Sequence, residues 1–395
     1  MVHRTDRILD NIPVGALGMI SLPGCEEMGN QVNDYLVKWR KETNHEHKDN
    51  IVFSGYENDT YLINAKVPRF GSGEAKGIIE ESVRGKDLYL MVDVCNYSLT
   101  YSLSGNTNHM SPDDHFQNLK RIIAAVGGKA RRLNVIMPFL YESRQHKRSA
   151  RESLDCALAL QELVRMGVDN IITFDAHDPR VQNAIPLSGF ETVRPTYQFI
   201  KGLLRSFDDL QLDSEHLMAI SPDEGATGRA IYFANVLGID MGMFYKRRDY
   251  TQVVNGRNPI VAHEFLGSSV EGKDVIILDD MISSGDSILD VAKQLKARKA
   301  KRIFAAATFG LFTNGMEKFD EAYEEGLIHG ILTTNLIYQT PELLSRPYYI
   351  NCDMSKYVAL LIDTLNHDGS ISGLLDPFDR IQAAVEAYKK GEPIE

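Results

Sequence analysis

Two adjacent carboxylates stand at the start of a stretch that otherwise has the residues of an anion-binding loop. Four apolar residues, 275–278, lead into Asp279 and Asp280. The positions beyond Ile282 are small or polar: Ser283, Ser284, Gly285, Asp286 and Ser287. Small residues let backbone amides close on a phosphate, while carboxylates accept hydrogen bonds from vicinal sugar hydroxyls. The stretch therefore fits a sugar phosphate, although an ordinary polar turn explains the same residues about as often.

The elements on either side would place this stretch at a ligand-binding edge. Residues 275–278 are apolar without alternation, which is typical of a buried parallel strand. Ile288, Val291, Ala292 and Leu295 fall on one face of a helix that follows. Ligands of open α/β sheets bind where the carboxyl end of a strand meets the start of the next helix, and the helix dipole favours phosphate there.

The same alternation of strand and helix runs along the chain and predicts parallel sheets with right-handed crossovers. Two α/β halves of similar design are expected to meet near Arg194, because 395 residues exceed one typical core. We expect strands at 87–93, 133–138, 170–174, 217–220, 241–245, 275–278, 302–308 and 330–334. Helices are expected at 116–126, 155–165, 229–237 and 288–295, with an amphipathic helix at 378–389.

The amino-acid composition limits the kinds of molecule that the chain is expected to bind. The chain is 43% hydrophobic and 25% charged, with a formal net charge of −11, which makes it a poor candidate for binding nucleic acid or an anionic membrane. The four cysteines have no metal-like spacing and are expected to be reduced thiols of a cytoplasmic protein. The first twenty residues lack the apolar core of a signal peptide, and no segment is apolar enough to span a membrane.

Residues 275–287 resemble the phosphoribosyl-pyrophosphate-binding loop of type I phosphoribosyltransferases. Further segments, in order and at similar spacing, resemble the ribose-phosphate diphosphokinases, which make phosphoribosyl pyrophosphate. These segments are Arg69–Glu74 with Ile79–Gly85, Arg144–Gln145 with Arg151–Glu152, Phe174–His177, Ser221–Gly225 with Arg229–Ala230, Lys246–Arg248, and Tyr357–Leu375.

The resemblance implies two tandem type I phosphoribosyltransferase-like domains, each a mainly parallel sheet flanked by helices. An ATP-side domain would cover residues 1–193 and take in the tail 366–395, and a ribose 5-phosphate-side domain would cover 194–365. The implied reaction moves the diphosphoryl group of ATP to the C1 hydroxyl of ribose 5-phosphate and releases AMP. The family places the ATP site between subunits, so a homo-oligomer, a dimer or a hexamer, is implied.

The resemblance also assigns roles to residues. Lys246 and Arg248 would neutralise charge in the transition state, and Mg²⁺ would be the cofactor, contacted by His177 and Asp223. The substrate sugar would bind to Asp279, Asp280, Ser283, Ser284, Gly285, Asp286 and Ser287. The nucleotide would bind to Phe70, Ser72, Glu74, Arg144, Gln145 and His146. Read without the family, Lys246–Arg248 would be a solvated basic cluster; the polar stretch 249–259 after it is consistent with a flap.

Three departures from the family fall on the expected nucleotide site. Ser72 stands where an acidic residue is usual, His146 stands where aspartate is usual, and the spacing around Arg144 is shifted by one residue. The chain also has extra residues before position 60, at 104–114 and after Pro377. Two alternatives therefore stay open: a phosphoribosyltransferase that consumes phosphoribosyl pyrophosphate, and a catalytically silent regulatory homologue.

Overall fold

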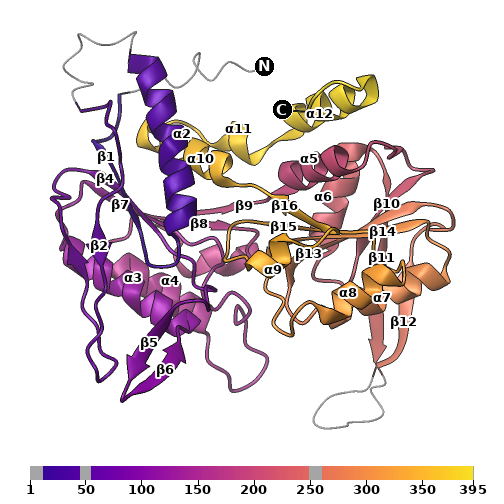
Figure 1. Cartoon of the computed structure of the whole chain (residues 1–395), viewed down its shortest axis with the longest axis horizontal. Helices are drawn as coiled ribbons and strands as arrows, with labels where there is room; N and C mark the ends of the chain where they lie inside the picture. Colours follow the sequence, from indigo (N-terminus) through magenta and orange to yellow (C-terminus); the bar gives the residue numbers. More distant parts are fainter. Residues whose placement is uncertain (1–11, 45–54, 249–259, 395) are drawn as a thin grey trace. The chain divides into compact units, whose positions relative to one another are not determined.

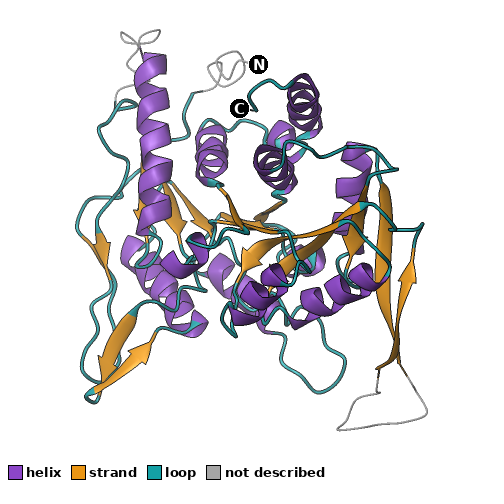
Figure 2. Cartoon of the chain, turned by 45° about the vertical axis from the view of Figure 1, so that its right-hand side comes forward, coloured by secondary structure: helices purple, strands orange, loops and turns teal. Residues whose placement is uncertain are grey.

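The computed structural model describes residues 12–44, 55–248 and 260–394, which form two compact units (Figures 1 and 2). Unit 1 takes the chain up to Arg194 together with Asn335–Tyr338 and Asp353–Asp376. Unit 2 takes Pro195–Thr334, Gln339–Cys352 and the chain from Pro377 onward. Within the described residues, none of the helices has the length and hydropathy that crossing a membrane requires.

Unit 1 is built on a five-stranded sheet in which every neighbouring pair is parallel. In spatial order the strands are β1 (Leu17–Ser21), β4 (Asp87–Met91), β7 (Arg132–Ile136), β8 (Asn170–Phe174) and β9 (Gly189–Val193). The strands expected at 87–93, 133–138 and 170–174 are therefore confirmed, whereas β1 and β9 were not predicted. All five carboxyl ends lie at one edge, so the loops that follow them converge there.

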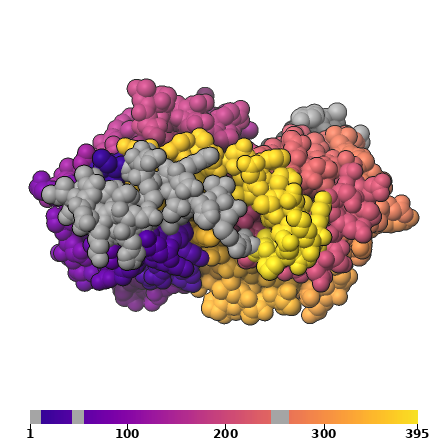
Figure 3. Space-filling model, turned by 90° about the horizontal axis from the view of Figure 1, so that it is seen from above, coloured from indigo at the N-terminus to yellow at the C-terminus, as the bar shows by residue number. Residues whose placement is uncertain are grey.

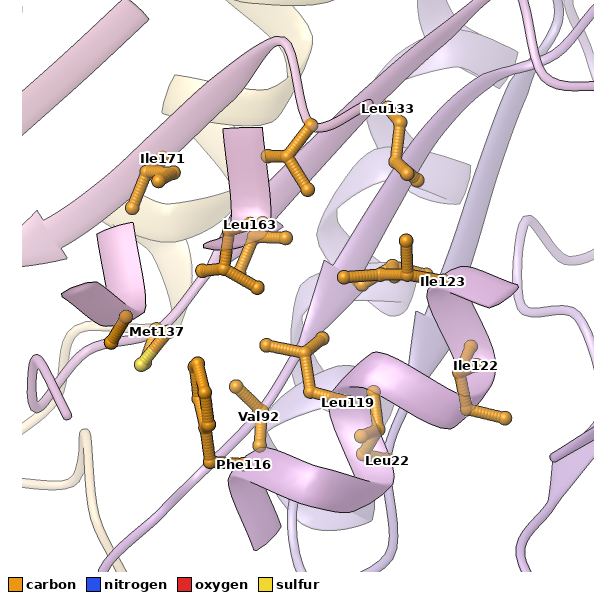
Figure 4. Packing of buried hydrophobic residues seen from close by; sticks show 14 of the residues in the cluster. Leu22, Val92, Phe116, Leu119, Ile122, Ile123, Leu133, Met137, Leu163 and Ile171 are labelled. Carbon is orange, nitrogen blue, oxygen red and sulfur yellow. The ribbon is translucent and has the colours of Figure 1, made fainter. Parts of the chain in front are cut away.

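Helices cover both faces of this sheet (Figure 1): α3 (Pro112–Val126) and α4 (Asp155–Arg165) lie on one face, α2 (Glu26–Asn44) and α10 (Ser355–Asn366) on the other. α3 begins at a capping box formed by Ser111 and Asp114, with Pro112 at the first helical turn, and ends at Gly127 in the left-handed conformation. Its apolar face supplies Phe116, Leu119 and Ile123 to the core that α4 also enters (Figure 4).

Shorter elements complete the unit: η2 (Pro179–Ala184), α11 (Ser372–Leu375) and the pairs β2 (Ala65–Lys66) with β3 (Ile78–Ile79) and β5 (Thr100–Leu103) with β6 (Asn106–His109).

Unit 2 is built on a seven-stranded sheet with one antiparallel edge strand. In spatial order the strands are β12 (Ile260–Leu266), β11 (Asp240–Arg248), β10 (Leu217–Ser221), β13 (Asp274–Ile282), β14 (Arg302–Gly310), β15 (Gly330–Thr334) and β16 (Tyr349–Cys352). All the strands that the sequence predicts here are present. β11 differs because it continues through Lys246–Arg248, which we had expected to follow the strand.

The central strand β13 explains why its apolar run does not alternate. Val275 and Ile277 enter a core with α7 (Asp286–Ala297) and α8 (Glu317–Glu324), while Ile276 and Leu278 enter a second core on the opposite face. That second core contains residues of α5 (Thr196–Ser206), α6 (Thr227–Leu237) and α12 (Phe378–Lys390). A strand covered on both faces in this way needs apolar residues at every position. The short helix α9 (Pro341–Leu344) completes the unit and leads into β16.

The structure corrects the expected division of the C-terminal chain. α10 belongs to unit 1, where the buried Arg40 of α2 pairs with Asp363 at 3.2 Å and bonds Asn366 at 2.7 Å. The tail beyond Pro377 belongs to unit 2 rather than to the first domain. Ile381 and Val385 of α12 fill the core beside α5 and α6, and the Tyr388 hydroxyl donates to the carbonyl of Phe207. Figure 3 shows this helix, in yellow, on the surface of unit 2.

Candidate active site

The two adjacent carboxylates lie near the carboxyl end of β13, inside the strand rather than after it. Asp280 is 3% exposed, and its amide donates to the Oδ1 of Asp279 at 2.8 Å. Arg229 of α6 brings Nη2 to 3.9 Å from the Oδ2 of Asp280. Strand pairing with β14 fixes both backbones, because Asp279 pairs with Ala307 in a parallel register. The carboxylates are therefore held by the strand pairing of the sheet.

Asp223 joins this pair to form what we call the carboxylate cluster: Asp223, Asp279 and Asp280. Burial raises the pKa of Asp279 well above its ordinary value, and the negative charges of Asp280 and then Asp223 raise it further. Asp223 follows β10, and its Oδ1 accepts from the amides of Gly225 and Ala226 at 2.9 and 3.2 Å. Three acids from two neighbouring strand ends thus share one environment, and hydrogen-bond donors or a cation would relieve their repulsion.

The small residues after β13 form the loop that leads into α7. Gly285 has φ of +84°, and a Cβ there would lie 2.2 Å from the Cζ of Phe319. Only glycine fits this position, both for its backbone conformation and for the space available. Ser283 and Ser284 are partly exposed, and in the described part of the chain their amides and that of Gly285 have no backbone acceptor. Such amides, next to a helix N-terminus, can bind a phosphate. We call residues 279–287 the sugar-phosphate loop.

Asp286 adds a carboxylate to this loop, and the structure shows how its charge is balanced. Lys318 of α8 places Nζ 2.6 Å from Oδ1 of Asp286, and the Ser284 hydroxyl donates to Oδ2 at 3.0 Å. The hydrogen bond from Lys318, with that from Ser284, lowers the pKa of Asp286. The sequence reasoning missed Lys318, because an exposed lysine thirty-two positions away carries no local signal.

The predicted catalytic cations lie on β11. Lys246 pairs with His263, Arg247 with Ala262 and Arg248 with Ile260 of β12, and the register shifts between Arg247 and Arg248. Bulges of this kind occur next to active sites and at sheet edges. The expected flap, 249–259, lies outside the described residues.

In unit 1, Phe70, Ser72 and Glu74 share one tight turn. The amide of Phe70 donates to the carbonyl of Glu74 at 2.8 Å, and the amide of Gly73 donates back to Phe70 at 2.9 Å. The Ser72 hydroxyl donates to the Glu74 carboxylate at 2.9 Å, so serine at this departure from the family orients the neighbouring acid. Phe70 is 54% exposed and presents its ring to solvent. We call residues 69–74 the nucleotide turn.

The first turn of α3 links the nucleotide turn to the loop after β7. Arg69 pairs with Asp114 at 3.0 Å, and the Tyr141 hydroxyl donates to Asp113 at 2.7 Å. Burial raises the pKa of Asp114, but its bonds with Ser111 and the charge of Arg69 outweigh that and lower the pKa overall. Two segments about seventy positions apart are therefore fixed to neighbouring residues of one helix.

The loops after β7 and β8 bring His146 and His177 together, with ring centroids 5.4 Å apart. The Nε2 of His146 lies 3.5 Å from Asp178, and among the described residues its buried Nδ1 has no hydrogen-bond partner. The hydrogen bond from Arg180 lowers the pKa of Asp178 to about 2, against the effect of burial, and His146 contributes to the same shift. The histidine that replaces the usual aspartate thus contacts the segment that carries His177, a contact that the sequence did not predict.

Arg144 and Gln145 differ in what they do. Arg144 is exposed, whereas the Gln145 amide donates to the carbonyls of Lys147 and Ser153 at 3.3 and 2.8 Å and shapes the loop. The two predicted metal contacts, His177 and Asp223, belong to different units. Within the ranges that the structure describes, the carboxylate cluster included, no group of three or more His, Cys, Asp or Glu side chains is arranged so that it could hold a metal ion.

Comparison with known proteins defines the class first: the chain carries phosphoribosyltransferase-type α/β units. Residues 17–167 match the model of the N-terminal domain of ribose phosphate pyrophosphokinase, and residues 194–336 match that of the phosphoribosyl transferase domain. A crystal structure of phosphoribosylpyrophosphate synthetase from Mycobacterium smegmatis has the same fold, with a TM-score of 0.70 at 21% identity over 89% of this chain and 99% of that one.

The ribose-phosphate pyrophosphokinase of Vibrio parahaemolyticus is 29% identical over 319 residues, which is 80% of this chain and 92% of that protein. The Mycoplasma genitalium enzyme of the same name is 29% identical over 68% of this chain and 74% of its own length. The chain belongs to the ribose-phosphate pyrophosphokinase family, whose members are also called diphosphokinases. The resemblance stated from the sequence and the predicted fold class are confirmed.

Proposed function

We propose that the chain transfers the diphosphoryl group of ATP to the C1 hydroxyl of ribose 5-phosphate, giving phosphoribosyl pyrophosphate and AMP. The observation that carries the proposal is the continuity of the sugar-phosphate loop. Within nine residues, buried carboxylates at a strand end pass into amides at a helix start. That order matches a ligand with hydroxyls at one end and a phosphate at the other.

The carboxylate cluster would bind the sugar hydroxyls. The pKa of Asp279 is raised by burial and by its acidic neighbours, so charged oxygens there gain from hydrogen-bond donors. The 5-phosphate would bind the amides of Ser283, Ser284 and Gly285, with Ser287 adding a hydroxyl. Lys318 neutralises Asp286 beside this phosphate site, which reduces the repulsion that its carboxylate would otherwise cause.

The nucleotide would bind unit 1. The exposed ring of Phe70 offers a face for adenine, and Arg144 offers a guanidinium to the phosphates. Glu74 is oriented by Ser72, and the buried Nδ1 of His146 has no hydrogen-bond partner among the described residues. Gln145 shapes the loop that carries both Arg144 and His146.

In the transfer, the C1 oxygen attacks the β-phosphorus, and the bond from that phosphorus to the oxygen of AMP breaks. The C1 hydroxyl releases its proton to water, and negative charge grows on the departing AMP oxygen. Lys246 and Arg248 are assigned to neutralise this charge, lysine as a point charge and arginine as a fork. The work of the protein is then positioning and charge neutralisation.

Mg²⁺ is assigned as the cofactor, and when bound it would neutralise the phosphates of ATP. The donor chemistry of Asp223 fits, because a hard cation prefers oxygen and the carboxylate cluster carries excess negative charge. The nitrogen of His177 is a softer donor and fits a contact through water better than direct coordination. A homo-oligomer, dimer or hexamer, and a cytoplasmic location complete the proposal; the four cysteines are free thiols, in keeping with that location.

The test is AMP formation that depends on ribose 5-phosphate. Purified protein with ATP, Mg²⁺ and ribose 5-phosphate is expected to form AMP, and omission of the sugar phosphate should abolish it. AMP in equal amounts without the sugar phosphate would indicate a hydrolase, and no AMP at all would reject the proposed activity.

A silent regulatory subunit is the second candidate, favoured by the replacements at Ser72 and His146. Calorimetry with a non-hydrolysable ATP analogue separates the two, since the proposed enzyme must bind it and a silent subunit with a lost nucleotide site would not. A phosphoribosyltransferase would instead form nucleotide from phosphoribosyl pyrophosphate and a free base, which the same preparation can be assayed for.

A further inference from the structure

We propose that the β5–β6 hairpin, residues 100–109, positions the nucleotide turn, and that Tyr101 is the residue through which it acts. The inference rests on the proposed function, because it concerns how the same turn would be prepared for ATP. It assigns a role in nucleotide affinity to a hairpin whose tip and second strand lie in the stretch 104–114, which the sequence presented only as extra residues.

The contact runs through Arg69, the first residue of the nucleotide turn. Its guanidinium lies 4.0 Å from the centre of the Tyr101 ring, which is the geometry of a cation–π interaction. The same guanidinium donates to the carbonyl of Gly73 at 3.0 Å and pairs with Asp114 at 3.0 Å. Tyr101 therefore supports a side chain that ties both ends of the turn together.

The tip of the hairpin reaches the other side of the turn. The amide of Ser104 donates to the carbonyl of Gly71 at 3.2 Å. Leu103 packs so closely on Gly73 that a Cβ at Gly73 would lie 2.9 Å from its Cδ1. The base of the hairpin is anchored in turn, since Met110 donates to the carbonyl of Leu99 at 2.8 Å and His109 Nδ1 lies 2.7 Å from the carbonyl of Tyr97.

These contacts have a consequence for Phe70. Its ring is exposed, yet the residues on both sides of it are held, Arg69 by Tyr101 and Gly71 by Ser104. A turn that is already ordered loses less conformational entropy when a ligand binds, so its affinity for the ligand rises without a new contact to the ligand. Tyr101 is a positioning residue in this account, because it acts through Arg69.

The experiment compares Tyr101→Leu with Tyr101→Phe, with Thr107→Ala as the matched control. Leucine removes the ring that faces Arg69, phenylalanine keeps it, and Thr107 is an exposed residue of the same hairpin. Given the usual strength of a cation–π contact, Tyr101→Leu should raise KM for ATP about three- to tenfold. KM for ribose 5-phosphate and kcat should stay within about twofold of wild type, and the other two variants should match wild type in all three.

An unchanged KM for ATP in Tyr101→Leu overturns the inference, and so does an equal rise in Tyr101→Phe, because the ring would then not be the cause. An equal loss of kcat and of thermal stability in Tyr101→Leu would indicate a purely structural tyrosine and also overturns it. Failure of the proposed function is a separate result: the wild type itself would then form no AMP from ATP and ribose 5-phosphate.

Discussion

Each unit has an acid whose pKa is raised by burial near the carboxyl end of an interior strand, but the surroundings of the two acids differ. Asp93, just after β4 in unit 1, accepts from the amides of Cys95 and Tyr338 at 2.8 and 2.6 Å. Asp279, near the end of β13 in unit 2, has Asp280 and Asp223 as its charged neighbours. Backbone amides make Asp93 a structural residue, whereas three acids gathered together favour an external ligand. A buried acid is therefore a stronger indication of a ligand site when other acids, rather than backbone amides, surround it.

The largest effect is expected for Lys246→Ala, which tests whether the reaction takes place in unit 2, the unit that contains the carboxylate cluster. Removing a cation that neutralises transition-state charge should lower kcat by about 10²–10³-fold with little change in thermal stability. Lys299→Ala is the matched control, because Lys299 forms an exposed pair with Glu271 at 2.8 Å and should leave kcat unchanged. An equal loss of thermal stability in Lys246→Ala would make this lysine structural.

Gly285→Ala tests the sugar-phosphate loop, and Gly272→Ala is the control because its backbone conformation is similar. Both glycines have positive φ, +84° and +76°, but only Gly285 has an atom near a new Cβ, the Phe319 ring at 2.2 Å. The backbone cost of about 1 kcal/mol is common to both variants, and the clash adds about 1–3 kcal/mol at Gly285 alone. Gly285→Ala should also raise KM for ribose 5-phosphate about tenfold or more, because the clash would displace the loop amides that are assigned to the phosphate. Equal behaviour of the two variants in melting and kinetics would contradict the assigned loop geometry.

Asp279→Asn and Asp280→Asn test which substrate the cluster binds. Each change replaces a charged acceptor by an amide, so KM for ribose 5-phosphate should rise about tenfold, more than KM for ATP. Asp290→Asn, at an exposed position of α7, serves as control. A larger rise in KM for ATP than for the sugar phosphate would reverse the assignment.

The smallest effect concerns Asp93 and appears as a pH dependence of stability. Burial raises the pKa of Asp93 to about 7, so the folded state holds a proton that the unfolded state has lost above about pH 4. The contribution of Asp93 to stability is therefore fully present below pH 4 and falls as the pH rises toward 7. Asp93→Asn cannot titrate, so the melting temperature of the wild type relative to this variant should decrease between pH 4 and pH 7. A constant difference over that range would show that Asp93 does not titrate there.

What the sequence could predict depended on how local each contact is. Residues 279–287 form one continuous stretch, so their types and order were enough to predict a loop between a strand and a helix, which the structure contains. The contacts of Lys318 with Asp286, of Tyr101 with Arg69 and of His146 with Asp178 each join residues 32 positions apart, and no local pattern marks them. α10 lies in a segment that the sequence matched only by resemblance, and distant contacts, among them the buried pair of Arg40 with Asp363 and the bond from Arg40 to Asn366, assign it to unit 1.

The central claim is that a diphosphoryl group, rather than a single phosphoryl group, moves from ATP to the sugar phosphate. Two incubations with ribose 5-phosphate and Mg²⁺ test it directly, one with ATP labelled at the α-phosphorus and one with ATP labelled at the β-phosphorus. We expect the α label only in AMP and the β label only in the sugar product. A β label that remains in ADP would show transfer of the γ-phosphoryl group alone and would contradict the account.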